Sequence, residues 1–240
     1  MTKVKKSKQV EKPQSHNPDI SALAQFQPSS KNSDLVSKIG KLKIKSFGLW
    51  NPEEEFQEFD EQKPTHPYDK IILAGKRPTW EMENILPDFD PDDMDCPIGE
   101  GVDLYDSGDA NGAIRHMKGL IKKDSRCIDA YAHLGNWCFE DGDLQSLENA
   151  LNYYKIGAAI GLKSIGKKSN DVFPWGLIDN RPFFRCLHGL GLCFYRMKKP
   201  TEALMIFSKM IWMNPSDNQG ARFLINALID GISWEKFSDN

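Results

Sequence analysis

The feature that most constrains the fold is a repeated spacing of small and apolar residues in the second half of the chain. Gly101 and Gly135 are 34 residues apart, and Ala113 follows Gly101 at the same interval at which Ala203 follows Gly191. Apolar residues then recur at matching offsets: Ala113, Met117 and Leu120 in one segment, and Ala203, Phe207 and Met210 in the other. A fixed period of this length indicates a supersecondary unit that repeats along the chain and buries its apolar face against its neighbours.

Each unit is expected to be a pair of helices. The runs "CIDAYAHLGNWCF" and "LENALNYYKIGAAI" form one pair, and "PFFRCLHGLGLCFYRM" and "KPTEALMIFSKMIWMNP" form another. Glycine and alanine suit the points where two helices cross closely, because a larger side chain would push the axes apart. Pro215 ends the last of these helices. Ser216 and Gln219 then have the spacing of a capping box that begins a further helix.

These residues resemble the tetratricopeptide repeat, a pair of antiparallel helices with a fixed period equal to the interval between Gly101 and Gly135. The matching positions are Tyr131, Leu134, Gly135, Ala150, Tyr154 and Ala158 in one unit, and Leu187, Leu190, Gly191, Phe194, Ala203, Phe207 and Pro215 in the next. The run "WGLIDNRPFFR" with the segments after it is also similar to a group of uncharacterised prokaryotic tetratricopeptide proteins, a likeness that implies no activity. The resemblance extends from Asp92 to Gly231.

The resemblance implies a fold that is all-α in the main, a solenoid of about three helix pairs and a terminal helix. Two spacings depart from the family pattern. The interval from Gly135 to Ala150 is longer than that from Gly101 to Ala113, which predicts an enlarged turn at "EDGDLQS". The interval from Gly135 to Gly191 is longer than one repeat, which predicts an insertion whose Phe173, Pro174 and Trp175 pack back on the helices.

The chain divides into four expected segments. Residues 1–33 are a disordered basic tail, because they lack the apolar periodicity needed to offset the entropy of ordering. Residues 34–91 are an irregular acidic and aromatic arm, residues 92–232 are the helical repeat domain, and residues 233–240 are a C-terminal tail. Within the arm, the segment from Ser33 to Trp50 fits a short helix or an alternating strand, and the apolar run "YDKIILAG" fits a strand.

The distribution of charge matters more for partner choice than the net charge of −3. Residues 51–110 hold 18 acidic and 4 basic residues, so the rest of the chain holds 16 acidic and 27 basic ones. No apolar run is long enough to cross a membrane, and the N-terminus lacks the apolar core of a secretory signal. The five cysteines form no CxxC pair, which favours reduced thiols and a cytoplasmic protein.

The expected binding surface is the concave face of the solenoid. In tetratricopeptide arrays the first helices of successive units line this face, and extended peptides commonly bind there. Helical phase places seven side chains on it: His133, Asn136, Arg185, His188, Tyr195, Arg222 and Asn226. Arginine can hold a carboxylate and asparagine can both donate and accept, so this set suits a peptide backbone or a carboxylate. The family's carboxylate clamp needs a lysine one turn before an asparagine, and Ala132 stands there.

Metal sites and catalysis are not expected. Asp88, Asp90 and Asp92 have the alternating spacing of a calcium loop, but Asp93 takes the place of the required glycine and Glu100 falls one residue beyond the bidentate position. Cys186, His188 and Cys193, with His133, lack a tetrahedral ligand spacing and are better explained as core residues. No phosphate loop, nucleophile elbow or HExxH motif is present, and no cofactor is implied.

Three functional hypotheses follow. The first is a non-catalytic scaffold or adaptor that binds a protein or peptide segment in the groove. The alternative is a nucleic-acid-associated regulator whose basic tail and "KSIGKK" segment contact phosphates, and whose binding would depend strongly on salt. In the third, the acidic arm occupies the groove and inhibits binding until a partner displaces it.

Overall fold

The computed structural model describes residues 30–56, 68–92 and 96–238. This part of the chain is mostly helical, with 65% helix, 7% strand and no closed barrel. The predicted basic tail lies outside the described residues except for its last four, where a helix already begins. The predicted C-terminal tail contains a short helix, α11 (Trp234–Ser238), because Trp234 packs edge-on against Phe139 and Tyr195 at ring distances of 5.6 and 5.7 Å.

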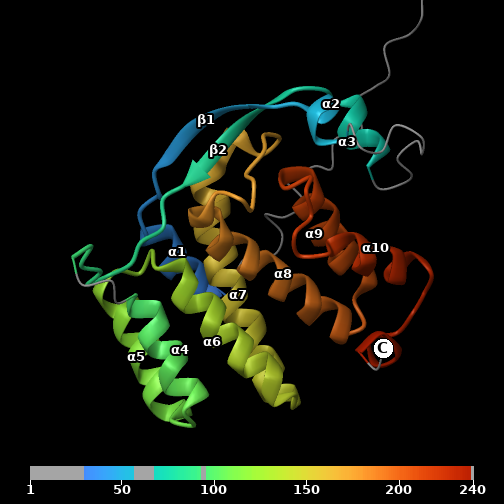
Figure 1. Ribbon diagram of the computed structural model, residues 1–240. Coiled ribbons are helices and arrows are strands. Elements are labelled where there is room, and N and C mark those ends of the chain that lie inside the picture. Colours follow the sequence, from blue (N-terminus) through green and yellow to red (C-terminus); the bar gives the residue numbers. More distant parts are fainter. Residues whose placement is uncertain (1–29, 57–67, 93–95, 239–240) are drawn as a thin grey trace, which may run out of the picture.

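Seven helices in succession build the body of the fold (Figure 1). They are α4 (Pro97–Asp106), α5 (Ala110–Lys123), α6 (Ile128–Asp141), α7 (Leu144–Ile165), α8 (Arg181–Arg196), α9 (Pro200–Met213) and α10 (Ala221–Ile229). Each helix packs against the next along the chain, and α6 also contacts both α4 and α8. The even-numbered helices from α4 to α8 therefore form one row, and the odd-numbered helices pack beside them.

The repeated glycines lie where the helices approach most closely, as the sequence predicts. A side-chain carbon added at Gly101 would lie 2.6 Å from Met117, one added at Gly135 would lie 2.5 Å from Tyr154, and one added at Gly191 would lie 2.6 Å from Phe207. Each contact joins the first helix of a pair to the second. The alanines of the same pattern, Ala113, Ala150 and Ala203, are all 0% exposed.

Replacing one of these glycines should therefore lower stability, although alanine is the better helix former. We expect Gly135→Ala to lower the free energy of unfolding by about 1–2 kcal/mol, because overpacking against the Tyr154 ring outweighs a helix-propensity gain of about 1 kcal/mol. Gly119 is the matched control, since a side-chain carbon there meets nothing within 4 Å. Gly119→Ala should raise stability by about 0.5–1 kcal/mol. Urea unfolding of both variants checks the opposite signs, and a stabilised Gly135→Ala protein would contradict the close contact.

Two local predictions about the helical body were wrong. The turn between α6 and α7 is not enlarged, because the extra residues lengthen the helices and leave only Gly142 and Asp143 between them. Gly142 takes the left-handed conformation with φ of 80°. Ser216 and Gln219 do not cap α10; instead, the Asp217 carboxylate accepts hydrogen bonds from the backbone N–H groups of Ala221 and Arg222 at 2.7 and 3.0 Å.

The arm is more regular than predicted. It contains α1 (Ser30–Lys38), β1 (Ile44–Trp50), α2 (Pro52–Glu55), α3 (Asp69–Leu73) and β2 (Arg77–Met82). The segment from Ser33 to Trp50 was predicted to be either a helix or a strand. It contains the end of helix α1 followed by strand β1. The run at 68–75 forms the helix α3 (Asp69–Leu73) rather than a strand, and this helix buries Ile71.

Strands β1 and β2 pair in antiparallel fashion from Ile44 opposite Met82 to Trp50 opposite Arg77. Figure 1 shows this ribbon curving over the helices, from α1 and α7 at one end to α2 and α3 near α9 at the other. The free edge of β2 is extended by the loop after α7: Trp80 N–H donates to the Val172 carbonyl at 2.9 Å, and Val172 N–H donates to the Pro78 carbonyl at 2.8 Å. Val172 and Phe173 are 0% exposed, so the insertion packs back as predicted.

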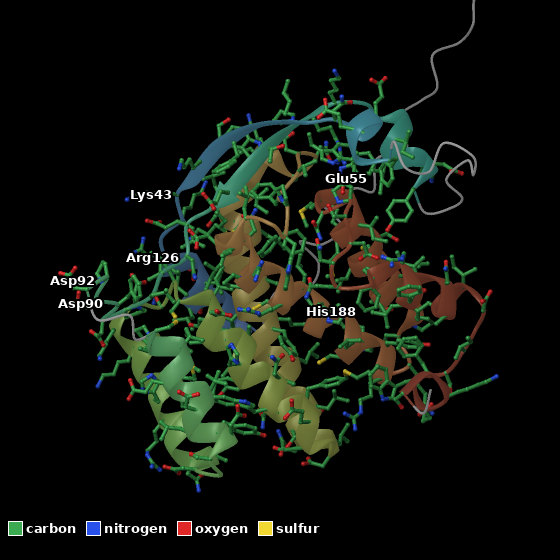
Figure 2. The ribbon with its side chains drawn as sticks, in the orientation of Figure 1. Lys43, Glu55, Asp90, Asp92, Arg126 and His188 are labelled. Carbon is green, nitrogen blue, oxygen red and sulfur yellow. The ribbon has the colours of Figure 1, made fainter. Side chains whose placement is uncertain are left out.

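Both ends of the ribbon are fixed to helices. At one end the Lys163 ammonium of α7 donates to three carbonyls at the end of α1, those of Val36, Ser37 and Ile39, at 3.1, 2.9 and 2.6 Å. At the other end the Ser216 hydroxyl donates to Glu55 at 2.5 Å, and Figure 2 shows Glu55 beside the C-terminal helices. The ribbon thus links the ends of helices that are distant in sequence.

Candidate functional site

A pocket of about 250 Å³ lies beside α6 and α8, near the turn that precedes α10. Its walls combine two neighbouring helix pairs with the start of the next. The lining residues are Asn136, Phe139 and Glu140 of α6, Tyr154 of α7, Arg185, His188, Gly189 and Leu192 of α8, and Gln219 of the turn. Figure 2 shows His188 in the interior of the helical body.

Glycine residues shape the base of this pocket. The ring of Tyr154 lies against both Gly135 of α6 and Gly189 of α8, and a side-chain carbon at Gly189 would collide with the ring atoms. Tyr154 therefore reaches between the two helices, and its hydroxyl donates a 2.7 Å hydrogen bond to Oδ1 of Asn136. Burial raises the pKa of Tyr154 far above its usual value, so the hydroxyl stays protonated and the bond is maintained.

Arg185 enters the pocket with its charge already paired. Its Nη1 donates to both carboxylate oxygens of Asp129 on α6, at 2.6 and 2.8 Å, and the Asp129 side chain is only 9% exposed. A paired, partly buried guanidinium is held in a fixed orientation. The pair also joins α6 to α8 at the site, and it leaves Nε and Nη2 of Arg185 outside the bond to Asp129.

His188 and Gln219 each bring an unpaired polar atom to the pocket wall. Within the described residues, Nε2 of His188 and Oε1 of Gln219 are shielded from solvent and have no hydrogen-bond partner. Burial lowers the pKa of His188 to about 4, so the ring is neutral at pH 7 and can both donate and accept. Both atoms are therefore unused by the described protein groups, and a ligand with matching groups can pair with them.

The charges around the pocket nearly balance. Arg185 is neutralised by Asp129, His188 is neutral, and Glu140 adds an exposed carboxylate that accepts a 3.4 Å hydrogen bond from Tyr105. Phe139 and Leu192 supply apolar walls. Among the described residues that line the pocket there is no serine, threonine, cysteine or lysine that could act as a nucleophile. The arrangement is suited to binding a polar group through hydrogen bonds.

The structure brings together three of the seven residues predicted for the groove: Asn136, Arg185 and His188. The others lie outside this pocket. His133 is 3.9 Å from Asp129 and stands beside the Trp137 ring, and Tyr195 is buried with its hydroxyl donating to the Ile232 carbonyl at 2.7 Å.

The last two predicted groove residues are on α10. Arg222 is held by Asp217, to which its Nη1 donates at 3.0 Å. Asn226 is exposed one turn further along the helix. Asp217 both caps α10 and pairs with Arg222, so the Arg222 guanidinium is held at the start of α10.

The residues weighed for metal binding are placed apart or in the core. Asp88 pairs with Lys123, and Oδ1 of Asp90 accepts from the Asp92 backbone N–H at 2.9 Å; Figure 2 shows Asp90 and Asp92 at the outer edge, away from His188. The Cys186 thiol packs against Gly157 of α7, and burial raises its pKa well above the usual value. Among the described residues no group of three or more acidic, histidine or cysteine side chains could hold a metal ion.

The lysines of the "KSIGKK" segment and the arm bear on the nucleic-acid and autoinhibition hypotheses. Lys163 of the "KSIGKK" segment is bound to α1, and Lys168 lies 4.6 Å above the Trp80 ring. None of the arm residues that the structure describes lines the pocket. In the described part of the chain, no helix has the length and apolar character needed to traverse a lipid bilayer.

Sequence reasoning missed three polar contributors to the pocket: Glu140, Tyr154 and Gln219. A helical spacing of four from Asn136 to Glu140 was a usable signal, because both lie on one face of α6. Tyr154 was assigned only to the helix crossing. Gln219 was assigned only to a capping box, because its place in the pocket depends on how the turn before α10 folds back.

Comparison with protein-family models gives no match, and comparison with curated proteins gives no significant match.

Proposed function

We propose that the protein is a non-catalytic scaffold or adaptor that binds an extended peptide segment along the row of helices α4, α6 and α8. In this proposal α4–α5, α6–α7 and α8–α9 are three tetratricopeptide-like helix pairs and α10 is the terminal helix. The repeated glycine contacts at Gly101, Gly135 and Gly191 support this assignment. So do the contacts of α6 with α4 and α8, since stacked repeats bring their first helices together.

The observation that carries the proposal is the shared pocket. Asn136 of one helix pair and Arg185 and His188 of the next, chosen from helical phase as binding residues, lie around one hollow. The described residues that line the hollow offer hydrogen-bonding groups and include no serine, threonine, cysteine or lysine. A cytoplasmic location belongs to this proposal, and it is supported by the five cysteines, which are all free, as expected in a reducing compartment.

Affinity purification from the protein's own cells tests the proposal. Leu192→Trp should fill the pocket without touching the Arg185–Asp129 pair, and we expect it to reduce recovery of a stoichiometric protein partner at least about tenfold, which corresponds to about 1.4 kcal/mol of binding free energy. Leu204→Trp is the matched control, because Leu204 is a half-buried leucine of α9 that does not line the pocket.

Salt separates the proposal from nucleic-acid binding. A protein partner held by the pocket should remain bound at high salt, whereas nucleic acid held through phosphates should wash off. Recovery that is equal for Leu192→Trp and the wild type would contradict the assignment of the site. Recovery of nucleic acid alone, lost at high salt, would contradict the adaptor function itself.

A further inference from the structure

The pocket beside α6 and α8 offers two kinds of hydrogen-bonding group at once. Nε2 of the neutral His188 and Oε1 of Gln219 lack partners within the described residues. Asn136 already accepts from Tyr154 through Oδ1, so its amide N–H groups remain for other acceptors. A ligand that completes this set must carry at least one donor and one acceptor.

The groups around the pocket disfavour an ionic ligand of either sign, an anion through charge and a cation through its lack of an acceptor. A carboxylate entering the pocket would meet Glu140 at the wall, and the positive charge of Arg185 that could attract it is already neutralised by Asp129. An ammonium or guanidinium group has no acceptor, so it would leave the amide N–H groups of Asn136 without a partner. His188 adds no charge, because its burial keeps the ring neutral at pH 7. Groups of like charge in a partly buried site are mutually repulsive.

The size of the pocket fits one side chain. A volume of about 250 Å³ lies below the range of about 300–1,000 Å³ that is usual for sites of drug-sized ligands. Phe139 and Leu192 offer apolar surface to a short methylene chain, while His188 and Gln219 offer hydrogen bonds. A primary carboxamide on such a chain carries a carbonyl acceptor and two N–H donors without charge.

We propose that this pocket is a carboxamide-recognition site that receives a glutamine or asparagine side chain of the bound peptide. The carboxamide carbonyl accepts from the His188 ring, and its N–H group donates to Oε1 of Gln219. This inference rests on the proposed function, since it names the side chain that the peptide segment would insert.

Three small probes of similar size test the chemistry on the full chain: propionamide, propionate and propylamine, the last charged at pH 7. An NMR titration should follow the ring nitrogens of His188 and the side-chain amide of Gln219. We expect propionamide to shift both sets of signals saturably, and the other two probes to bind at least about tenfold more weakly. Propionate or propylamine binding as tightly as propionamide, or signals that propionamide leaves unmoved, would overturn the proposal.

Variants assign the binding to these atoms. His188→Phe and Gln219→Met each remove one hydrogen-bonding group, and each should weaken propionamide binding about five- to tenfold. Gln145→Met is the matched control, because Gln145 is exposed in the first turn of α7 and does not line the pocket. Unchanged affinity in both pocket variants would also overturn the proposal. The probes on the wild-type chain keep the test decisive even if a variant folds poorly.

The two tests can fail separately. If Leu192→Trp abolishes capture of a protein partner but propionamide does not bind, the adaptor function stands and the carboxamide inference falls. If propionamide binds and no partner depends on the pocket, the site recognises amides without serving the proposed adaptor.

Discussion

Arg77→Ala should lower the free energy of unfolding by about 3–4 kcal/mol, the largest effect that we expect from a single side chain. Arg77 is the first residue of β2 and is 6% exposed. It stands between two indole rings, with its guanidinium carbon 4.8 Å from the Trp50 ring centre and 4.5 Å from that of Trp212. Its Nη1 donates to the Trp212 carbonyl at 2.8 Å and to the Asn170 carbonyl at 3.2 Å.

The expected loss of stability in Arg77→Ala is large because one substitution removes both hydrogen bonds and cation–ring contacts. A hydrogen bond from a charged group contributes about 1.5–3 kcal/mol, and a desolvated cation stacked on an aromatic ring contributes about 2 kcal/mol. Against these stands the cost of a buried charge, since Nε and Nη2 of Arg77 have no partner within the described residues. Burial lowers the pKa of Arg77 to about 10, partly opposed by Asp171, so the group is still charged at pH 7.

Arg77→Met separates packing from charge. Methionine keeps much of the contact with the rings and relieves the buried charge, so we expect a loss of about 1–2 kcal/mol, roughly half that of alanine. Arg181→Ala is a control, because Arg181 also stacks on an indole ring and bonds one carbonyl, but is only half-buried. Urea unfolding gives all three values. A methionine variant as stable as the wild type would show that the guanidinium hydrogen bonds add nothing to stability.

The helix pairs were the predictable part of this fold, and the reason is local. The close contacts join helices that are adjacent in sequence, such as Gly135 with Tyr154 and Gly191 with Phe207. One short stretch of sequence therefore contains both partners of each contact. Small residues must stand where two axes approach, and this requirement survives changes elsewhere. The length of the turn between α6 and α7 did not follow, because added residues can extend helices as readily as a loop.

The ribbon was not predictable in the same way. β1 ends at Trp50 and β2 begins only at Arg77, and the surroundings that order them come from α7, α9 and the loop around Val172. Phe47 and Leu49 of β1 are exposed, so the strand lacks the simple alternation that marks a half-buried sheet. A two-stranded ribbon gains stability by packing on other elements, which no local pattern reveals.

The candidate site was half predictable. Asn136 and the pair Arg185 and His188 follow from helical phase, because each lies on the face of its helix that was predicted to line the groove. Gln219 depends on the shape of the turn before α10, which Asp217 sets by capping the helix in place of the expected Ser216. The ion pair between Arg222 and Asp217 also depends on that turn, which helical phase does not describe. Phase alone therefore predicted Arg222 to be a groove residue.

Acid should destabilise the protein through His188, by about 3 kcal/mol between pH 7 and pH 4. Burial lowers the pKa of His188 to about 4, against about 6.5 in an unfolded chain. Between these two values the unfolded state binds a proton that the folded state does not, so stability falls as the pH falls. A difference of about 2.5 pKa units corresponds to about 3 kcal/mol at about 1.36 kcal/mol for each unit.

His188→Gln should remove this share of the pH dependence, because glutamine stays neutral across the range and can still donate a hydrogen bond from the end of its side chain. We expect the stabilities of the wild type and the variant, measured by urea unfolding, to differ progressively between pH 6.5 and pH 4 in favour of the variant. Their difference above pH 7 should be constant. Curves that stay parallel from pH 7 to pH 4 would show that the pKa of His188 in the folded protein is close to its value in the unfolded chain.

His133→Gln provides the comparison at a second shielded histidine, which lies on α6 outside the pocket. Burial also lowers the pKa of His133, but the neighbouring Asp129 raises it and so opposes the shift. Removing His133 should therefore change the slope in the same direction and by less. If His133→Gln instead removed most of the acid sensitivity, the fall in stability would come from protonation of His133 beside Asp129. Protonation of the buried His188 would then not be the main cause.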